Sequence, residues 1–334
     1  MDAKALVTNA HPRFSIESVS LPDPGPRQIK VQTLYSGVSI GTEFAVIKGK
    51  LNWGPYPLVT GYQGVGIVEQ VGSEVTEYAI DDRVYYRNNM EIKSTDGTPI
   101  SSASGVHCSH AVNNIDGNHA AAKLPEGADE ETASTFVMPA VGLNGVDIAN
   151  PRMGQTVVVY GSGLIGLGVV AACSHRGCIV IAADIEGGRL EIAKRLGADY
   201  AINLEKEDIG ERVEEISPDG ADIVFESTGV SDCIDPAIAL CKREGKFVLQ
   251  GNYGAKPISY HFLPPHSKRL TMYYPCDDGL EMCRRAVIKN MAAGVLPWHH
   301  TITHRCSFED APQLFDALNR GRAATVLGAV IRWA

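Results

Sequence analysis

The sequence has no strongly basic segment and no long, uninterrupted apolar run. Its 30 Lys and Arg are outnumbered by 39 Asp and Glu, the net charge is −9, and no basic cluster exceeds a pair such as Lys268-Arg269. Nucleic acids and anionic membrane surfaces attract concentrated positive charge, so we expect neither as a partner. The uncharged stretch 156–173 contains four glycines, which favour a strand, a turn and a helix over a membrane span.

Cysteine occurs eight times, but never as a Cys-x-x-Cys pair. This usage is typical of free thiols in a reducing compartment. The first residues run directly into a strand-like pattern and lack the basic region and apolar core of a signal peptide. We therefore expect a cytoplasmic protein.

Two domains are expected from the length of 334 residues and from a change of pattern along the chain. The first part has short runs rich in Val, Ile, Tyr and Thr, which are typical of strands. These runs are Ala3–Thr8, Ile29–Tyr35, Gly64–Val71 and Arg83–Tyr86. From about Ser134, strands alternate with helices, which indicates a parallel sheet covered on both faces. We predict an α/β fold with one domain at 1–139 and 279–334 and the other at 140–278.

A glycine-rich motif follows the first strand of the alternating part. Gly161, Gly163 and Gly166 lie between the predicted strand Thr156–Tyr160 and the predicted helix Leu164–His175. In this context the first glycine permits a tight turn, the second lets the backbone approach a pyrophosphate, and the third lets helix and strand pack closely. The helix N-terminus faces negative charge. The motif predicts a dinucleotide site, and a tight connection without a ligand is the alternative.

An acidic residue, Asp184, ends the next predicted strand. A carboxylate there accepts the ribose hydroxyls of NAD and repels the 2′-phosphate of NADP, so the sequence favours NAD, although Arg189 weakens that preference. Asp184 could also cap the following helix. The ends of later strands should line the cofactor as well. The predicted cofactor-binding residues are Gly161, Ser162, Gly163, Leu164, Ile165, Gly166, Asp184, Ile185, Arg189, Thr228, Gly229, Gly251 and Asn252.

Six short stretches carry a resemblance to a known family. They are Gly37–Glu43, Gly61–Gly66, Asp82–Val84, Asp184–Ile185, Lys194–Asp199 and Phe225–Gly229. In these stretches, and over nearly its whole length, the chain resembles the medium-chain dehydrogenase/reductase superfamily, which includes the zinc alcohol dehydrogenases. The resemblance implies a GroES-like β-rich catalytic domain, a Rossmann domain with a doubly wound parallel sheet, and an oxidoreductase.

The zinc ligands of that family are missing. Where zinc-dependent members have a Cys, a His and a Cys or Glu, this chain has Ser39, Tyr62 and Met138, and Gln63 replaces the usual Glu beside the His. None of these is a good zinc ligand. The region that carries structural cysteines in many relatives corresponds to 87–110, where only Cys108 remains. The resemblance therefore implies neither catalytic nor structural zinc.

Two histidine clusters are further metal candidates. His107, Cys108 and His110 are close in sequence, but strand alternation would put the first two on opposite faces, and no acidic partner is adjacent. His299, His300 and His304 are more typical of a surface or an interface. We expect no metal at either cluster.

Polar residues in the former metal pocket are the candidate catalytic residues: Ser39, Thr42, Glu43, Tyr62 and Gln63. Tyr62 is preferred, because a phenol can donate to a carbonyl oxygen and relay a proton if a nearby positive charge lowers its pKa. The alternative is that Tyr62 fills the volume of the lost metal with Gln63 packed against it. Glu43 could act as an acid or base, although a structural ion pair is favoured.

The stretch Ser39–Glu43, together with Tyr56–Tyr62, is similar to bacteriochlorophyllide-type alcohol dehydrogenases, which oxidise a hydroxyethyl group to a ketone. We predict a zinc-independent, NAD-dependent oxidoreductase acting on a small secondary alcohol or ketone, with sugar alcohols and cyclitols as further substrates. The alternatives are an enone or quinone reductase and a non-catalytic NAD(H)-binding protein. The family also implies a homodimer or homotetramer formed through the edge strand near Leu270–Pro275.

Overall fold

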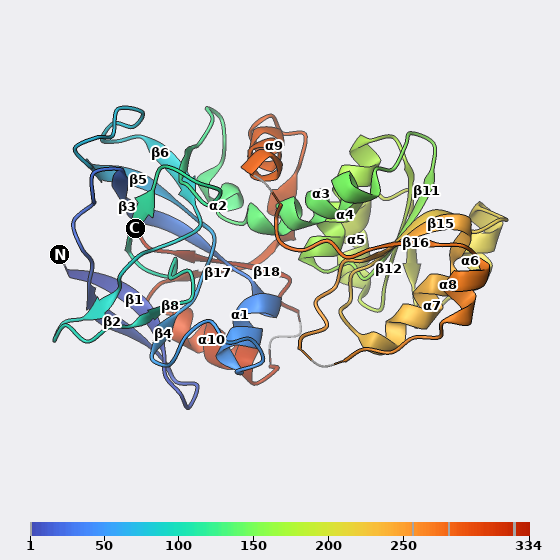
Figure 1. Cartoon of the computed structure of the whole chain (residues 1–334), viewed down its shortest axis with the longest axis horizontal. Helices are drawn as coiled ribbons and strands as arrows, with labels where there is room; N and C mark the ends of the chain where they lie inside the picture. Colours follow the sequence, from blue (N-terminus) through green and yellow to red (C-terminus); the bar gives the residue numbers. More distant parts are fainter. Residues whose placement is uncertain (1, 256, 280, 323–324) are drawn as a thin grey trace. The chain divides into compact units, whose positions relative to one another are not determined.

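The computed structural model describes residues 2–255, 257–279, 281–322 and 325–334, with the side chain of residue 281 left out. The chain forms two compact units (Figure 1). Unit 1 comprises Met1–Val137, Ile288–Val295 and Ile302–Ala334, and unit 2 comprises Met138–Val287 and Leu296–Thr301. The sequence places the return to the first domain at residue 279, whereas unit 2 continues to Val287, within helix α9 (Glu281–Ala292).

Unit 1 is built from two sheets. The five-stranded sheet has the order β7-β2-β1-β4-β8, and the seven-stranded sheet has the order β10-β6-β5-β3-β18-β17 with β9 also paired to β3. The strands are β1 (Asp2–Thr8), β2 (Phe14–Ser20), β3 (Gln28–Val38), β4 (Leu58–Val59), β5 (Gly64–Val71), β6 (Arg83–Tyr86), β7 (Lys93–Ser94), β8 (Ser101–Ser102), β9 (His110–Asn114), β10 (Ala122–Lys123), β17 (Ile302–Ser307) and β18 (Gly328–Arg332). Pairing of β18 with β3 returns the end of the chain to the β-rich part.

Among the described residues, helices α1 (Ile40–Ile47), α2 (Glu130–Ala133) and α10 (Ala311–Asn319) lie wholly in unit 1, which also contains the end of α9 from Ile288. Helix α1 follows β3 after Ser39 and buries Phe44 and Ile47 in a core with Phe315 of α10. The Phe44 and Phe315 rings are 5.4 Å apart. This packing holds the start of α1, and with it the Ser39–Glu43 stretch, in place.

Unit 2 is a six-stranded parallel sheet of order β13-β12-β11-β14-β15-β16. The strands are β11 (Thr156–Tyr160), β12 (Ile179–Asp184), β13 (Tyr200–Asn203), β14 (Ala221–Glu226), β15 (Cys241–Leu249) and β16 (Thr271–Tyr273). The strand order reverses between β11 and β14, and such a switch point is where α/β sheets bind nucleotides. The predicted Rossmann domain is therefore confirmed.

The helices of unit 2 cover both faces of its sheet, with α4 and α5 on one side and α6, α7 and α8 on the other (Figure 1). The elements are α3 (Val137–Ala149, whose first residue belongs to unit 1), α4 (Leu164–His175), α5 (Gly187–Arg195), α6 (Ile209–Ile216), η1 (Ser231–Cys233), α7 (Ile234–Ala239), α8 (Leu263–Ser267) and η2 (Trp298–Thr301). Every residue of β11 is buried, as expected of a central strand. No helix among the described residues is long and apolar enough to span a membrane.

One predicted element differs from the structure. The sequence suggests a helix from Cys233 to Cys241, but α7 ends at Ala239 and Cys241 is already the first residue of β15. The register of β14 and β15 shifts between Ala221 and Ile223. The Cys241 side chain is buried in the core of unit 2, so tertiary packing extends the strand into a stretch whose local pattern resembles a helix end.

Candidate functional site

The Tyr62 side chain lies in unit 1, in the segment between β4 and β5, and is 5% exposed. Its hydroxyl donates a hydrogen bond of 2.5 Å to Oγ of Ser39, which precedes α1. The Arg87 guanidinium lies 5.6 Å from the centre of the Tyr62 ring. The Trp53 ring packs edge-on at 6.4 Å. The two hydroxyls of the former metal pocket therefore contact each other.

Burial raises the pKa of Tyr62 to about 12, although hydrogen bonds with Ser39 and Thr42 and the charge of Arg87 act in the opposite direction. The groups that the structure contains do not lower this pKa, because desolvation of the phenolate outweighs the neighbouring cation, and the effect of a bound nicotinamide ring stays a prediction. At neutral pH the phenol keeps its proton. It can donate a hydrogen bond, but it is a poor base.

The Glu43 carboxylate is 1% exposed and accepts hydrogen bonds from three directions. Its Oε1 accepts from the backbone N–H of Ser39 at 2.7 Å, and its Oε2 accepts from Oγ1 of Thr60 at 2.7 Å. Nε2 of His107 lies 2.8 Å from the same Oε2. Glu43 therefore links α1 to two other segments of unit 1.

The other side of the His107 ring faces Ser36. Nδ1 lies 2.8 Å from Oγ of Ser36, which also accepts a 2.8 Å hydrogen bond from Nε1 of Trp333. The argument that His107 has no acidic partner is wrong, because Glu43 is distant in sequence but adjacent in space. Local spacing in the sequence predicts neither the contacts of His107 and Thr60 with Glu43 nor the contact of Arg87 with the Tyr62 ring.

The neighbours of His107 have separate environments. Burial raises the pKa of the Cys108 thiol to about 12, so this thiol stays protonated. His110 lies in β9, with Nε2 3.4 Å from a carboxylate oxygen of Glu69. The three residues close in sequence therefore have different partners.

Gln63 is fully buried beside Tyr62 in the sequence. Its Oε1 accepts a 3.0 Å hydrogen bond from the backbone N–H of Val137. Its Nε2 has no hydrogen-bond partner within the described part of the chain. A side-chain carbon at Gly37 would lie 3.0 Å from this nitrogen, so the amide fits only beside a glycine. The amide oxygen of Gln63 is therefore already bonded to the backbone of Val137.

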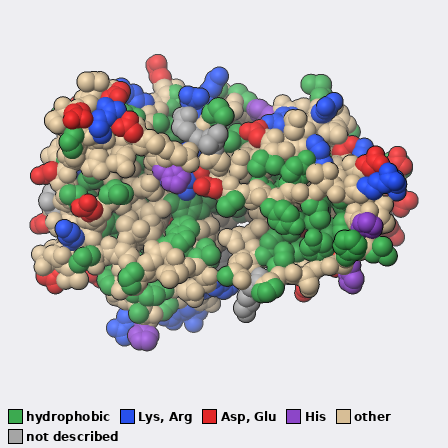
Figure 2. All heavy atoms as spheres, viewed as in Figure 1, with side chains coloured by type: hydrophobic (Ala, Val, Ile, Leu, Met, Phe, Trp, Pro, Cys, Tyr) green, Lys and Arg blue, Asp and Glu red, His purple; other side chains and the backbone are tan. Residues whose placement is uncertain are grey.

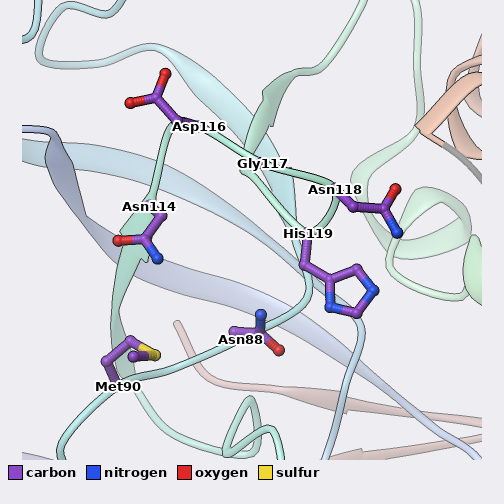
Figure 3. Close-up of a pocket in the computed structure, with 7 residues that line it drawn as sticks. All are labelled: Asn88, Met90, Asn114, Asp116, Gly117, Asn118 and His119. Carbon is purple, nitrogen blue, oxygen red and sulfur yellow. The ribbon is translucent and has the colours of Figure 1, made fainter.

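A polar hollow of about 230 Å³ lies elsewhere on unit 1 (Figure 3). Its walls come from two loops and consist of Asn88, Met90, Asn114, Asp116, Gly117, Asn118 and His119. Both Asp116 oxygens are held by Arg27, at 2.9 and 2.8 Å. His119 also lines the hollow, and its Nε2 lies 3.2 Å from Nη1 of Arg87. Arg87 therefore contacts both the Tyr62 ring and this hollow.

In unit 2, the three glycines of the motif have the geometry that their predicted roles require. Gly161 has φ +102°, and a side-chain carbon there would lie 2.7 Å from Cγ2 of Thr228. A side-chain carbon at Gly166 would overlap the carbonyl oxygen of Gly161. Gly163 faces open space and is the N-cap of α4, which has no side-chain cap. The helix N-terminus therefore presents free backbone N–H groups beside an open position.

Asp184 is held at the end of β12 by two backbone groups. Its Oδ2 accepts from the N–H of Ser162 at 2.7 Å, and its Oδ1 accepts from the N–H of Glu186 at 2.9 Å. Nη1 of Arg189 lies 3.7 Å from Oδ2. Glu186, not Asp184, is the N-cap of α5, so the capping alternative for Asp184 is wrong. The carboxylate is fixed next to the glycine-rich turn.

The loops after β14 and β15 meet beside this turn. Gly229 has φ +69°, and a side-chain carbon at Gly251 would overlap its backbone nitrogen. Glu226, fully buried, accepts from the N–H of Thr228 at 2.9 Å and also bonds the hydroxyl of Tyr253. The predicted residues Thr228, Gly229 and Gly251 are thus gathered together. Tyr253 was not predicted, because no local motif marks it.

Comparison with known proteins gives two family matches along the chain. Residues 25–125 match the alcohol dehydrogenase GroES-like domain, and residues 165–289 match the zinc-binding dehydrogenase family. Sorbitol dehydrogenase of Halalkalibacterium halodurans is 29% identical over 350 residues, covering 97% of this chain and 98% of the relative. Sorbitol dehydrogenase 2 of Saccharomyces cerevisiae is 30% identical over 285 residues, covering 78% of each.

A solved structure from Sinorhizobium meliloti 1021, described as a zinc-binding dehydrogenase bound to NADP, aligns with a TM-score of 0.86 and covers 99% of both chains at 21% identity. This likeness concerns the fold. The family matches and the yeast relative extend to the sequence, and they agree with the two units described above. The chain is an oxidoreductase of the medium-chain dehydrogenase/reductase superfamily, within its zinc-type alcohol dehydrogenase-like branch.

Proposed function

We propose that this protein interconverts a small secondary alcohol and its ketone with NAD(H) and without a catalytic zinc ion. The observation that carries the proposal is the buried hydrogen bond of 2.5 Å between Tyr62 and Ser39, which takes the place of two metal ligands of the family. A hydroxyl pair can bind a carbonyl or alcohol oxygen by hydrogen bonds.

The side chains at the positions that the resemblance aligns with the zinc ligands do not fit zinc. Zinc in proteins takes thiolate, neutral imidazole or carboxylate ligands. Tyr62, with its pKa raised to about 12 by burial, stays a neutral phenol, and Ser39 is a neutral alcohol. The amide oxygen of Gln63 is used by the backbone of Val137. The thiol of Cys108, in the region where relatives carry structural cysteines, is protonated as well.

Tyr62 acts as a hydrogen-bond donor to the substrate oxygen in this proposal. In ketone reduction, negative charge develops on that oxygen, and a phenolic donor in a buried site stabilises it. Without substrate the phenol donates its one proton to Ser39. On substrate binding this proton turns to the substrate oxygen and the Ser39 hydroxyl donates to the phenolic oxygen instead, while Arg87 adds positive charge beside the ring. When bound, the nicotinamide cofactor supplies or accepts the hydride. Because the raised pKa keeps the phenol protonated at neutral pH, Tyr62 has a proton to give to the oxygen of the reduced substrate, and solvent then returns a proton to the phenolate.

NAD(H) is the cofactor that we propose. Gly161, Gly163 and Gly166 fit a dinucleotide, since the open position at Gly163 lies at the N-terminus of α4. Asp184 supports NAD over NADP because its fixed carboxylate disfavours a 2′-phosphate. Arg189 opposes this, and the similar S. meliloti structure is described as NADP-bound. Relative affinity for the two cofactors is therefore a direct test of this assignment.

The substrate class that we propose is a hydroxylated small molecule such as a sugar alcohol or cyclitol. Two relatives of this chain are named sorbitol dehydrogenases. The amide-lined hollow of unit 1 offers hydrogen-bond donors and acceptors (Figure 3). Arg87 contacts both His119 of this hollow and the Tyr62 ring. Such groups suit hydroxyls better than an apolar quinone.

We also propose that the protein is a homo-oligomer formed through the edge of the sheet in unit 2. Strand β16 is the last strand of that sheet. Hydrophobic side chains gather over α8 and β16 (Figure 2), where Phe262, Leu263 and Tyr274 are 71%, 68% and 66% exposed. An open sheet edge beside exposed apolar side chains is typical of an interface.

Elemental analysis and product analysis together test the reaction. We expect less than about 0.1 zinc per chain and undiminished ketone reduction after treatment with a chelator. Stoichiometric zinc whose removal abolishes turnover would overturn the metal-free mechanism. If the protein reduces the C=C bond of an enone and leaves ketones unchanged, the enone reductase is correct instead. Stoichiometric NADH binding with no turnover over a broad panel of ketones and enones would favour the non-catalytic NAD(H)-binding protein.

A further inference from the structure

The proposed mechanism does not use His107, although this residue lies at the centre of a buried chain of hydrogen bonds in unit 1. Its side chain is fully buried. One ring nitrogen faces Glu43 and the other faces Ser36, both at 2.8 Å. Phe315 covers the ring with an edge-to-face contact at 5.5 Å. His107 therefore has no exposed surface with which to contact a substrate.

The hydrogen bonds around His107 form one continuous path to Tyr62. Trp333 donates to Ser36, Ser36 contacts His107, and His107 contacts Glu43. Glu43 then accepts from the N–H of Ser39, whose Oγ accepts from the Tyr62 hydroxyl. With a neutral imidazole that carries its proton on Nε2, the hydroxyl of Ser36 donates to Nδ1 and Nε2 donates to Glu43. The donors of Trp333, Ser36 and His107 then each meet an acceptor.

A second set of contacts ties His107 to the segment that carries Tyr62. The backbone N–H of His107 donates to the carbonyl of Thr60 at 3.0 Å, and the N–H of Val106 donates to the carbonyl of Gly61 at 3.1 Å. A side-chain carbon at Gly61 would lie 2.8 Å from the backbone nitrogen of His107 and 3.0 Å from its ring. The segment before Tyr62 is thus packed directly on His107.

We propose that His107 is a positioning residue for Tyr62, and this inference rests on the donor role proposed for Tyr62. His107 fixes the Glu43 carboxylate, Glu43 fixes the start of α1 at Ser39, and Ser39 fixes the phenolic oxygen. Small displacements of a catalytic group lower turnover strongly without changing which ligands bind. Loss of the contact between His107 and Glu43 therefore lowers kcat and leaves NADH affinity and KM nearly unchanged.

Two substitutions of His107 test its contact with Glu43 separately from its contact with Ser36. The amide nitrogen of His107→Gln takes the place of Nε2 and keeps the contact with Glu43. The shorter amide of His107→Asn takes the place of Nδ1, keeps the contact with Ser36 and does not reach Glu43. Both variants replace the ring by an uncharged amide, so each serves as the control for the other. Ketone reduction by the purified full chain, NADH binding by fluorescence and thermal unfolding are measured for each.

We expect His107→Asn to lower kcat by about 10- to 100-fold with KM and NADH affinity within about threefold, and His107→Gln to retain kcat within about fivefold. Equal losses in both variants would overturn the proposal. If His107→Asn does not fold, His107→Gln and Ser36→Ala are used for the test. A loss of kcat of more than about tenfold in both variants would overturn the proposal.

A double-mutant cycle with Tyr62→Phe distinguishes positioning from a general structural effect. If His107 acts through the phenol, His107→Asn has little further effect on the residual turnover of Tyr62→Phe. A full additive loss in that background would mean that His107 supports the fold only. If Tyr62→Phe itself keeps wild-type kcat, the proposed function fails, and this result is separate from any result on His107.

Discussion

The phenolic oxygen of Tyr62 lies 2.5 Å from Oγ of Ser39, and both side chains are buried. The resemblance to the family aligns these two positions with metal ligands of its zinc-dependent members. In our proposal the hydrogen bond between the two hydroxyls takes over the place of those ligands.

Removal of the Tyr62 hydroxyl is the first test of its role. We expect Tyr62→Phe to lower kcat for ketone reduction by about 10²- to 10⁴-fold, the usual contribution of a positioned proton donor. NADH affinity should stay the same, because the cofactor residues lie in unit 2. Tyr78→Phe is the matched control, since its hydroxyl bonds the carbonyl of Ala121 outside the pocket. Equal kcat values for the two variants would contradict the prediction.

The stability of the protein should fall at alkaline pH. Burial raises the pKa of Tyr62 from 10.0 to about 12, so the folded state holds this proton more tightly than the unfolded state. The resulting stabilisation is complete below about pH 10 and is lost as the pH rises through 12. Burial raises the pKa of Tyr86 in the same way. Urea unfolding between pH 8 and 11 should show this fall, and the free energy of unfolding should fall less steeply with pH in Tyr62→Phe. The same pH dependence of the free energy of unfolding in Tyr62→Phe and in the unsubstituted protein would argue that Tyr62 is solvated.

Two glycines of the dinucleotide motif should respond differently to alanine. A methyl group at Gly163 meets nothing within 4 Å, so Gly163→Ala should fold normally but weaken NADH binding by about tenfold or more by blocking the pyrophosphate. A methyl group at Gly166 overlaps the carbonyl oxygen of Gly161, so Gly166→Ala should lower the free energy of unfolding by about 1–3 kcal/mol. Isothermal titration and urea unfolding measure the two effects. NADH binding unaffected by Gly163→Ala would place the cofactor elsewhere.

Cofactor preference should depend on the charge of Asp184. The substitution Asp184→Asn can keep an oxygen for the N–H of Ser162 while removing the negative charge. We expect the ratio of NADPH to NADH affinity to rise by about tenfold, because repulsion of the 2′-phosphate is relieved. Arg189→Ala should change the ratio in the opposite direction. The dissociation constants of both cofactors for the two variants check this, and identical ratios would exclude Asp184 as the determinant.

The edge of the unit 2 sheet should govern assembly. A lysine in place of the exposed Leu263 puts a charge into the apolar surface around β16, and we expect it to shift an oligomer toward monomer. Ile80→Lys is the control, since Ile80 is 60% exposed in unit 1. Light scattering after size-exclusion chromatography gives the masses. Dissociation by the control alone would place the interface on unit 1.

Local sequence patterns predicted the elements of unit 2 well. Strand β11 and helix α4 begin and end at the predicted residues, because an apolar strand, a glycine turn and an apolar helix follow one another without competing signals. The glycine roles also follow from local steric requirements. Helix α1 was not predicted, since Gly41 and the β-branched residues around it favour a helix poorly. It forms because Phe44 and Ile47 are buried against Phe315.

The sequence alone determined which chemical groups this protein has available: a glycine-rich turn predicted to bind a dinucleotide, an acidic residue at the end of the next strand, and hydroxyls at positions that the resemblance aligns with metal ligands. Only the tertiary structure decided how those groups interact. Glu43 and His107 are far apart in the chain, and they meet where Phe315 packs on both the His107 ring and Phe44 of α1. Burial also decides the pKa of Tyr62, since it depends on neighbours that no local pattern specifies.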